Sequence, residues 1–532
     1  MSVARTVSEV LEQHVSFELE SIDRMYLNLY VPRLQRAEGV AYYWIYQRGA
    51  RFASTVLMAP MTAAFVRSIE QFAQRERVDL VPFAKGQRKD DVAHEYLAKF
   101  SREEGVLFIG KAQEKAAVVR TQTRHNEHTG ASYPWLVKST AMVNQYYFYC
   151  VDRDFGPFFL KLCSYFPYNG KLCINGHEYL KRQLAREGIA FEALDNGVLS
   201  CADPERAQQI ADELSPARID ALARKWFARL PHPYSKKDRR AGFRYDISIL
   251  QAELSLTQVL DRPVNGRIFF EQVLRDNLDL GRPDRIQLVF NRRVTRGTPG
   301  RFRTRVLTDG VTPMLYVDYK QTRIKQYHKQ GRALRTETTI NRPQDFELGK
   351  RLKNLPALRE VGLKANRRLL NVQRISHDCP LGQELFDQIH RPRTVGQQRA
   401  PALRFGDPRV LALLASLVLF RLLPNGFSNR DLRLAVSEML AEELSPGQMS
   451  YDLRRLRLHG LIERRPRSHR YEVTPLGFRA ALFLTRSYNR LLRPGLSCLG
   501  PEMPPATVPL RNAFEALDTA IDKAWQSQQI AA

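Results

Sequence analysis

The sequence predicts a multidomain protein of the α/β (α+β) class. Its 532 residues exceed the usual length of one domain, and 44% are apolar while 26% are charged, which is the composition of globular proteins. Stretches that alternate apolar and polar residues are interspersed with stretches of helical period. These observations predict a mixed-sheet N-terminal body, a basic antiparallel β-region with helices, and a C-terminal module built mainly of helices.

The N-terminal body is expected to span residues 1–200. Residues 13–31 alternate in pattern and predict two strands around Ser21-Ile22-Asp23. Four further segments have the period of a helix or of a buried strand: a helix at Met58–Gln74, strands at 105–109 and 145–151, and a helix at Gly176–Ala185. This mixture predicts a domain that contains both helices and a sheet.

Residues 201–390 are expected to form a second domain. Asp203-Pro204-Glu205 is a helix start, with an acid at the cap and proline at the first helical position. Residues 243–279 are predicted to be largely helical. From Ile286 to Ile340 the period changes to two, which predicts several strands.

Three segments complete the chain. Residues 391–403 are polar, basic and proline-bearing, and are expected to be a linker. Residues 404–494 are expected to form a separate module. Residues 495–532 are expected to be a tail, in which Leu510 to Trp525 repeats apolar residues with the period of an amphipathic helix.

The module at 404–494 is predicted to contain three helices, two short strands and a closing helix. The first helix is the apolar stretch 407–422. Ser428 caps the second helix, and Ser445-Pro446 opens the third, which ends at Gly460. The remaining elements are strands at 461–463 and 470–473 and a helix from Pro475 to about Arg490.

The stretch DLRRLRLHGLIERRP, followed by YEVTPLG, resembles the winged-helix DNA-binding domain. The resemblance implies that the third helix enters the major groove of double-stranded DNA and that the strand pair, or wing, lies along the backbone or minor groove. The DNA-contacting residues that it implies are Arg454, Arg455, Arg457 and His459 on the helix and Arg464, Arg465, Arg467 and Arg470 on the wing. A winged helix that binds another protein is the alternative.

The charge of the chain favours a polyanionic partner. Lys and Arg number 82 against 56 Asp and Glu, a formal charge of +26. Such an excess attracts anionic polymers, most simply nucleic acid. Residues 282–342 hold fifteen of the cations and only four acids, so they form a second basic region besides the module.

A hairpin in this basic region is predicted to carry cations on one face. Alternation places Arg323, Lys325, Tyr327 and Lys329 together, with Lys320 and Arg335 also in the hairpin. Cations that follow phosphates and a ring that stacks on a base suit single-stranded DNA or RNA. An ordinary solvated sheet face is the alternative.

The same hairpin, Ile324–Lys329 followed by Leu334–Glu337, resembles one in rolling-circle replication initiators. Those enzymes nick DNA with a tyrosine and a metal held by a histidine pair. The resemblance implies Tyr327 or Tyr319 as a nucleophile, although the chain has no His-x-His pair. The stretch Asp154–Leu184 also resembles a widespread bacterial group, from which no function follows.

Acids at predicted strand ends form a candidate catalytic metal site. Asp152 and Asp154 follow the strand expected at 145–151, and Asp23 follows the first strand of the chain. Carboxylates at adjacent strand ends hold Mg²⁺ in many nucleases. Mg²⁺ is therefore the cofactor expected if the chain cuts DNA, and ordinary loop acids are the alternative.

Cysteine usage and apolar runs predict a cytoplasmic protein that does not span a membrane. Six cysteines without a Cys-x-x-Cys pair do not form a disulfide framework. The longest apolar stretch, Val410–Phe420, is shorter than the roughly 20 residues of a membrane span. No secretory signal is recognisable at the N-terminus, and nothing indicates the oligomeric state.

Together these features predict a DNA-binding protein of bacterial type. In one role it processes the DNA of a mobile element, by transposition, replication initiation or nicking. In the other it is a non-enzymatic transcriptional regulator. The length favours the first role, because a regulator needs only a DNA-reading domain and a sensor. The lack of a complete catalytic motif favours the second, so the sequence does not decide whether the chain is an enzyme.

Overall fold

The structure, a computed structural model, divides into two compact units. Unit 1 comprises Met1–Gln13, Arg267–Gln287 and Arg367–Ala532, and unit 2 comprises His14–Gly266 and Leu288–Asn366. The structure describes residues 7–84, 86–280, 303–309, 312–377, 383–420 and 425–488, together with a few positions between 492 and 523. The predicted strands before residue 303 and most of the predicted helix Leu510–Trp525 fall outside these residues.

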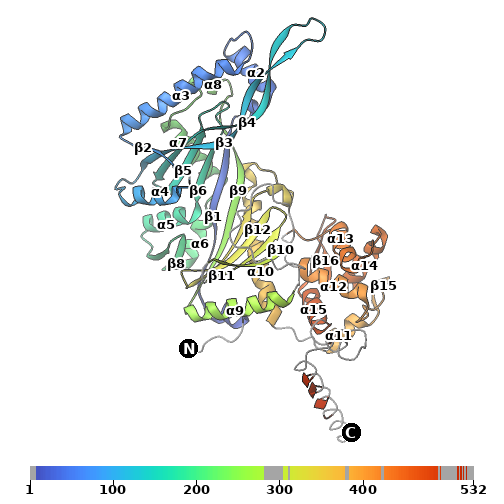
Figure 1. The fold of residues 1–532 in the computed structure, drawn as a ribbon. Helices are drawn as coiled ribbons and strands as arrows, with labels where there is room; N and C mark the ends of the chain where they lie inside the picture. The colour runs from blue at the N-terminus through green and yellow to red at the C-terminus, as the bar shows by residue number, and fades with distance from the viewer. Residues whose placement is uncertain are drawn as a thin grey trace. The chain divides into compact units, whose positions relative to one another are not determined.

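Unit 2 is built on one 11-stranded mixed sheet, which confirms the predicted α/β class (Figure 1). The strand order is β10-β11-β12-β13-β9-β1-β6-β5-β4-β3-β2, and all neighbours are antiparallel except β2 and β3. The strands are β1 (Val15–Tyr30), β2 (Leu80–Pro82), β3 (Gly105–His125), β4 (Ser132–Asp152), β5 (Gly156–Cys163), β6 (Gly170–Asn175), β9 (Asp246–Leu260), β10 (Arg303–Asp309), β11 (Thr312–Tyr319), β12 (Thr322–Lys329) and β13 (Ala333–Ile340). A separate hairpin joins β7 (Phe191–Leu194) to β8 (Gly197–Cys201).

β1 is a single strand where the sequence predicted two. Ile22 pairs with Leu254 of β9 and Met25 pairs with Ala252, so three residue steps of β1 face two steps of β9. Such a bulge re-aims side chains without ending the strand. The bulge includes Asp23, the first candidate carboxylate.

The prediction of a largely helical segment at 243–279 is wrong in its first half. Asp246–Leu260 forms β9, which lies between β1 and β13, and only α9 (Pro263–Leu280) is helical. Leu254 and Leu256 belong to a nearly continuous buried run in β9. Such a run fits a buried strand or a buried helix equally well by period alone. Because β9 pairs with β1, the sheet extends across the boundary expected at residue 200.

β3 and β4 are much longer than the short strands predicted at 105–109 and 145–151. Each has 21 residues, and the two pair almost from end to end. The predicted apolar stretches are the buried ends of this hairpin. Its outer part protrudes from the rest of the sheet and is largely exposed (Figure 1).

Three helices predicted in the N-terminal part of unit 2 are confirmed. They are α3 (Thr55–Glu76), α5 (Gly176–Arg186) and α6 (Pro204–Asp212). α6 begins as expected, because the Asp203 carboxylate accepts a hydrogen bond from the Arg206 N–H at 2.9 Å. Further helices are α2 (Ala37–Tyr42), α4 (Lys89–Ala98), α7 (Pro216–Arg229) and α8 (Lys236–Arg240).

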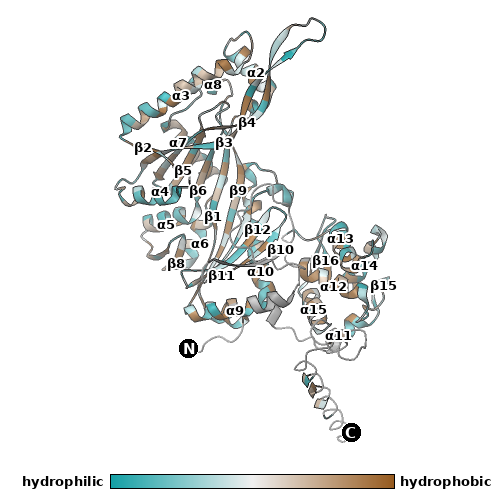
Figure 2. Ribbon diagram, viewed as in Figure 1, coloured by the Kyte–Doolittle hydropathy of each residue, from teal (hydrophilic) through white to brown (hydrophobic). Residues whose placement is uncertain are grey.

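The C-terminal part of unit 1 is mainly helical, and α12 is strongly apolar (Figure 2). Its elements are α11 (Gln383–His390), β14 (Arg393–Val395), β15 (Gln398–Ala400), α12 (Pro408–Phe420), α13 (Asn429–Leu440), α14 (Pro446–Leu458), β16 (Ile462–Arg464), β17 (Tyr471–Val473) and α15 (Pro475–Ser487). The segment predicted to be a linker therefore contains the hairpin β14–β15. α10 (Leu355–His377) belongs partly to each unit. Within the described ranges, no helix combines the length and the apolar run that crossing a membrane requires.

Local capping explains why α13 and α14 begin where the sequence predicted. The Ser428 hydroxyl accepts from the Asp431 N–H at 3.3 Å, and the Asp431 carboxylate accepts from the Ser428 N–H at 2.9 Å. Ser445 and Gln448 form the same reciprocal pair at the start of α14. These capping boxes satisfy N–H groups that have no partner inside the helix.

Candidate functional site

α14 turns two of its predicted DNA-contacting arginines outward. Arg454 and Arg457 are exposed, whereas Met449, Leu453 and Leu456 are buried. The buried residues recur at helical spacing, so they occupy the face that packs against the module core. The outward face of α14 is therefore polar and positively charged.

Arg455 and His459 do not lie on this outward face, which corrects their assignment as DNA contacts. The Arg455 guanidinium donates to the backbone oxygens of Pro401 and Ala402. His459 is buried, and its Nε2 lies 2.9 Å from the Pro401 oxygen. Burial lowers the pKa of His459, so the ring is neutral at pH 7. Both side chains hold the segment that follows β15 against α14.

The β16–β17 hairpin carries two more exposed arginines, Arg464 at the end of β16 and Arg467 in the loop. Arg465 instead donates to the Asn425 side chain at 2.6 Å, and its Nε lies 3.4 Å from Glu472. We call Arg454, Arg457, Arg464 and Arg467 the exposed arginine set. In the described part of the chain, none of the four forms an ion pair with a carboxylate.

Arg470, predicted to be a DNA contact of the wing, is directed at the protein. Its guanidinium donates to the Gly426 oxygen at 3.4 Å and lies 3.9 Å from the Asp431 carboxylate. Phe427 forms an isolated antiparallel bridge with Tyr471. Arg470 therefore helps to join the start of α13 to the β16–β17 hairpin.

The basic hairpin of unit 2 shows the alternation that the sequence predicted. Along β12, Arg323, Lys325 and Tyr327 are half-buried, and the residues between them are buried. Lys320 is exposed in the turn before β12. Arg323 is neutralised by Asp318 at 2.8 Å, and Nζ of Lys325 lies 4.0 Å from the centroid of the Tyr327 ring. Lys329 is half-buried, and burial lowers its pKa.

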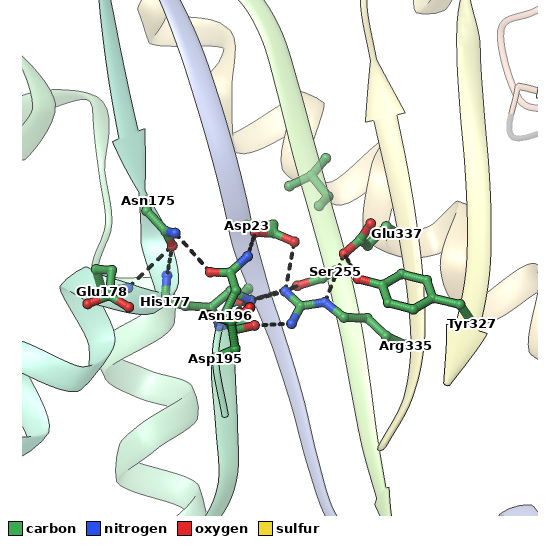
Figure 3. Close-up of polar contacts among 12 residues, drawn as sticks. Asp23, Asn175, His177, Glu178, Asp195, Asn196, Ser255, Tyr327, Arg335 and Glu337 are labelled. Carbon is green, nitrogen blue, oxygen red and sulfur yellow. Dashed lines mark hydrogen bonds and ion pairs between the residues drawn. The ribbon is translucent and has the colours of Figure 1, made fainter. Parts of the chain in front are cut away.

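Arg335, predicted to lie on this cationic surface, is completely buried. Figure 3 shows its polar contacts. Its Nη2 donates to Asp23 at 2.7 Å, and its Nε lies 3.0 Å from Glu337. Its Nη1 donates to the backbone oxygen of Asn196, in the turn between β7 and β8. The alternation correctly placed Arg335 on the same face of the sheet as Tyr327. At β13, however, the turn between β7 and β8 covers this face of the sheet. Arg335 is therefore a structural cation.

Asp23, a candidate metal ligand, is the principal partner of Arg335. Burial alone would raise the pKa of Asp23, but the charge of Arg335 and a hydrogen bond from Asn196 outweigh it and hold the pKa well below its usual range. His177 lies in the same cluster, and its Nε2 is 3.2 Å from the Ser255 hydroxyl. Burial, followed by the charge of Arg335, lowers the pKa of His177, so the ring stays neutral.

Tyr327, the candidate catalytic tyrosine, donates from Oη to Glu337 at 2.7 Å (Figure 3). Burial raises the pKa of the Tyr327 phenol, and the charge of Glu337 raises it further. A nucleophilic tyrosine needs the opposite change, because the phenolate is the attacking form. The geometry therefore gives Tyr327 a structural contact and does not support the nicking role.

Asp152 and Asp154 are not brought together with Asp23. Oδ2 of Asp152 accepts from Lys225 Nζ and from Trp226 Nε1, both at 2.8 Å, and Oδ1 accepts two N–H groups of the following turn. Both carboxylate oxygens of Asp152 are thus occupied. Among the residues that the structure describes, no group of three His, Cys, Asp or Glu side chains is arranged to hold a metal ion. The proposed Mg²⁺ site is not formed by these three aspartates.

Glu253 on β9 has a pKa that makes stability depend on pH. Burial raises this pKa from 4.5 to about 7, the charge of Asp23 adds to the shift, and Arg24 opposes it. Between these two pH values the unfolded chain has released a proton that the folded protein still holds. Glu253 therefore lowers the stability as the pH rises from 4.5 to 7.

Replacing Glu253 with glutamine should raise the free energy of unfolding by roughly 1–3 kcal/mol at pH 8 and change it little at pH 4. Urea denaturation of both proteins at each pH measures the difference. The control is Glu192→Gln, at an exposed position on β7. A gain of equal size at both pH values would show that the charge of Glu253 is not the cause.

The buried cluster around Arg335 was not found by sequence reasoning. Asp23, His177, Asn196 and Ser255 come from separate elements of unit 2, and no spacing in the sequence links them. Comparison of the chain with protein-family models, with curated proteins and with solved structures finds no match. The function must therefore be argued from the geometry of these sites.

Proposed function

We propose that the chain binds double-stranded DNA through residues 404–494, which we interpret as a winged helix. The order α12, α13, α14, β16, β17 and α15 supports this interpretation. The isolated bridge between Phe427 and Tyr471 also ties the segment before α13 to the β16–β17 hairpin, so the helices and the hairpin belong to one module. In such domains the third helix, here α14, enters the major groove.

The observation that carries the proposal is the exposed arginine set. Arg454 and Arg457 lie on the element that would enter the groove, and Arg464 and Arg467 lie on the element that would follow the backbone. A guanidinium reads guanine edges and clamps phosphates with its fork of N–H donors. Asp452 of α14 forms an ion pair, and so do Arg465 and Arg470 of the hairpin. None of these three side chains belongs to the exposed arginine set.

A protein-binding winged helix is less well supported. The other exposed residues of α14 include Gln448, Ser450 and Tyr451, so one ring is the only large apolar group on this face. An interface core is usually depleted in charge and rich in aromatic residues. The charge and composition of this face favour a polyanion.

We propose no reaction for the chain. The side chains that would have carried nicking are engaged in structural contacts: Asp152 with Lys225 and Trp226, and Tyr327 with Glu337. Processing of mobile-element DNA and transcriptional regulation both require the proposed binding. They differ in whether the chain alters the bound strand, a reaction for which Mg²⁺ would be the cofactor.

Fluorescence anisotropy of the full chain with a labelled 30-bp duplex tests the proposal. We expect binding that weakens linearly on a log–log plot as salt rises, by about 0.9 in slope for each phosphate contacted. No binding at about 50 mM salt, where such contacts are strong, would refute it. The same samples with Mg²⁺, run on a denaturing gel, separate the two roles, because only DNA processing leaves a cut or covalent product.

A further inference from the structure

An open pocket of about 710 Å³ on the sheet of unit 2 has a strongly cationic lining. Lys89 at the start of α4, Lys161 of β5 and Lys171 of β6 line it, and Glu114 of β3 is the one acid among the described lining residues. The lining therefore has a formal excess of two positive charges. A phosphate monoester carries about −1.5 to −2 at pH 7, which this excess matches.

Glu114 fixes the position of two of the lysines. Its carboxylate accepts from Lys89 Nζ at 2.6 Å, from Lys161 Nζ and from the Tyr147 hydroxyl. Burial would raise the pKa of Glu114, but hydrogen bonds from Lys161 and Lys89 lower it to about 2. Glu114 is therefore ionised, and it orients Lys89 and Lys161. Three charged groups of the pocket, Glu114, Lys89 and Lys161, are thus held in place before a ligand arrives.

Aromatic rings form the rest of the lining. Phe159 of β5 lies between Tyr26 of β1 and Tyr147 of β4, with ring centroids 6.3 Å and 5.6 Å away. Nζ of Lys89 is 4.0 Å from the centroid of the Tyr147 ring. Rings beside cations provide a surface on which a nucleobase can stack while its phosphate meets the charges.

We propose that this pocket binds a nucleotide, with the phosphate at Lys89, Lys161 and Lys171 and the base against Phe159 and its aromatic neighbours. The volume falls within the roughly 300–1,000 Å³ of small-molecule sites. The nucleotide is either free or one unit of a single-stranded nucleic acid. The site lies wholly in unit 2, whereas the proposed duplex-binding module lies in unit 1, so neither proposal depends on the other.

Isothermal titration of the full chain with AMP, adenosine and inorganic phosphate tests the proposal. AMP should bind at least about tenfold more tightly than either fragment, because it alone satisfies both halves of the pocket. A single-stranded dT20 probe identifies the source of the nucleotide. Tighter binding of dT20 than of AMP indicates a polymer, and the reverse indicates a free nucleotide. If neither AMP nor dT20 binds, the proposal fails.

Substitutions of lining residues test whether AMP binds in this pocket. Lys161→Met and Lys171→Met should each weaken AMP binding by about tenfold or more, and Tyr26→Ala should weaken AMP more than phosphate. The matched control is Lys115→Gln, an exposed lysine next to Glu114 on β3 that does not line the pocket. Since Lys161 binds Glu114, Lys171→Met gives an independent test if Lys161→Met unfolds. Equal AMP affinity in the Lys171 and Lys115 variants would overturn the proposal, whatever the duplex affinity.

Discussion

Replacing Arg335 with methionine should lower the free energy of unfolding of unit 2 by roughly 3–5 kcal/mol. The Arg335 side chain has no exposed surface, and it lies against Glu337 and against Asp23, which is almost fully buried. Without the guanidinium, Asp23 must either keep an unpaired charge in the interior or take up a proton. Both alternatives cost free energy, because burial penalises an isolated carboxylate.

Urea denaturation of Arg335→Met and of a matched control measures this loss. The control is Arg332→Met, three residues earlier, where the side chain is about half exposed. Adding Asp23→Asn to Arg335→Met should recover part of the loss, because the double variant buries no unpaired charge at Asp23. An unchanged midpoint for Arg335→Met would contradict the view that this ion cluster holds β1, β9 and β13 together.

Replacing both Arg454 and Arg457 with alanine should greatly weaken binding to duplex DNA. Each side chain is exposed on α14, and neither forms an ion pair with an acid among the described residues, so no such pair must break before the arginine meets a phosphate or base. If both contact phosphates, the log–log salt slope should fall by about two. If one contacts a base edge, the loss should include about 1–3 kcal/mol of sequence discrimination at that position.

The salt-dependent anisotropy of this double variant should be compared with that of Arg479→Ala. Arg479 is an exposed arginine of the same module, on α15 and outside the exposed arginine set. Its loss removes one positive charge from the module but no group from α14 or the hairpin. Equal losses of affinity per arginine would mean that overall charge, and not α14, drives binding.

Local signals in the sequence predicted much of the module. Ser428 and Ser445 start α13 and α14 through capping contacts that span only three residues, so the sequence contains both partners. The same holds for Asp203 at the start of α6. By contrast, β9 was mistaken for helix, because its buried apolar run has no clear period.

The functional residues were harder to predict, because their roles depend on distant partners. Arg335 is 312 positions from Asp23, and nothing near it in the sequence marks the burial. Alternation predicts which face of a strand a side chain occupies, but not what covers that face. For Arg455, the sequence does not reveal that its guanidinium donates hydrogen bonds to the backbone oxygens of residues 401–402.

Hydrogen–deuterium exchange of the full chain, with and without a duplex in excess, tests most directly whether α14 and its hairpin contact DNA. We expect added duplex to slow exchange in peptides from 446–474 and to leave the β1–β9–β13 region of unit 2 unchanged. Slower exchange confined to unit 2, or no change at 446–474 under conditions where the chain binds the duplex, would contradict the assignment of these arginines to DNA.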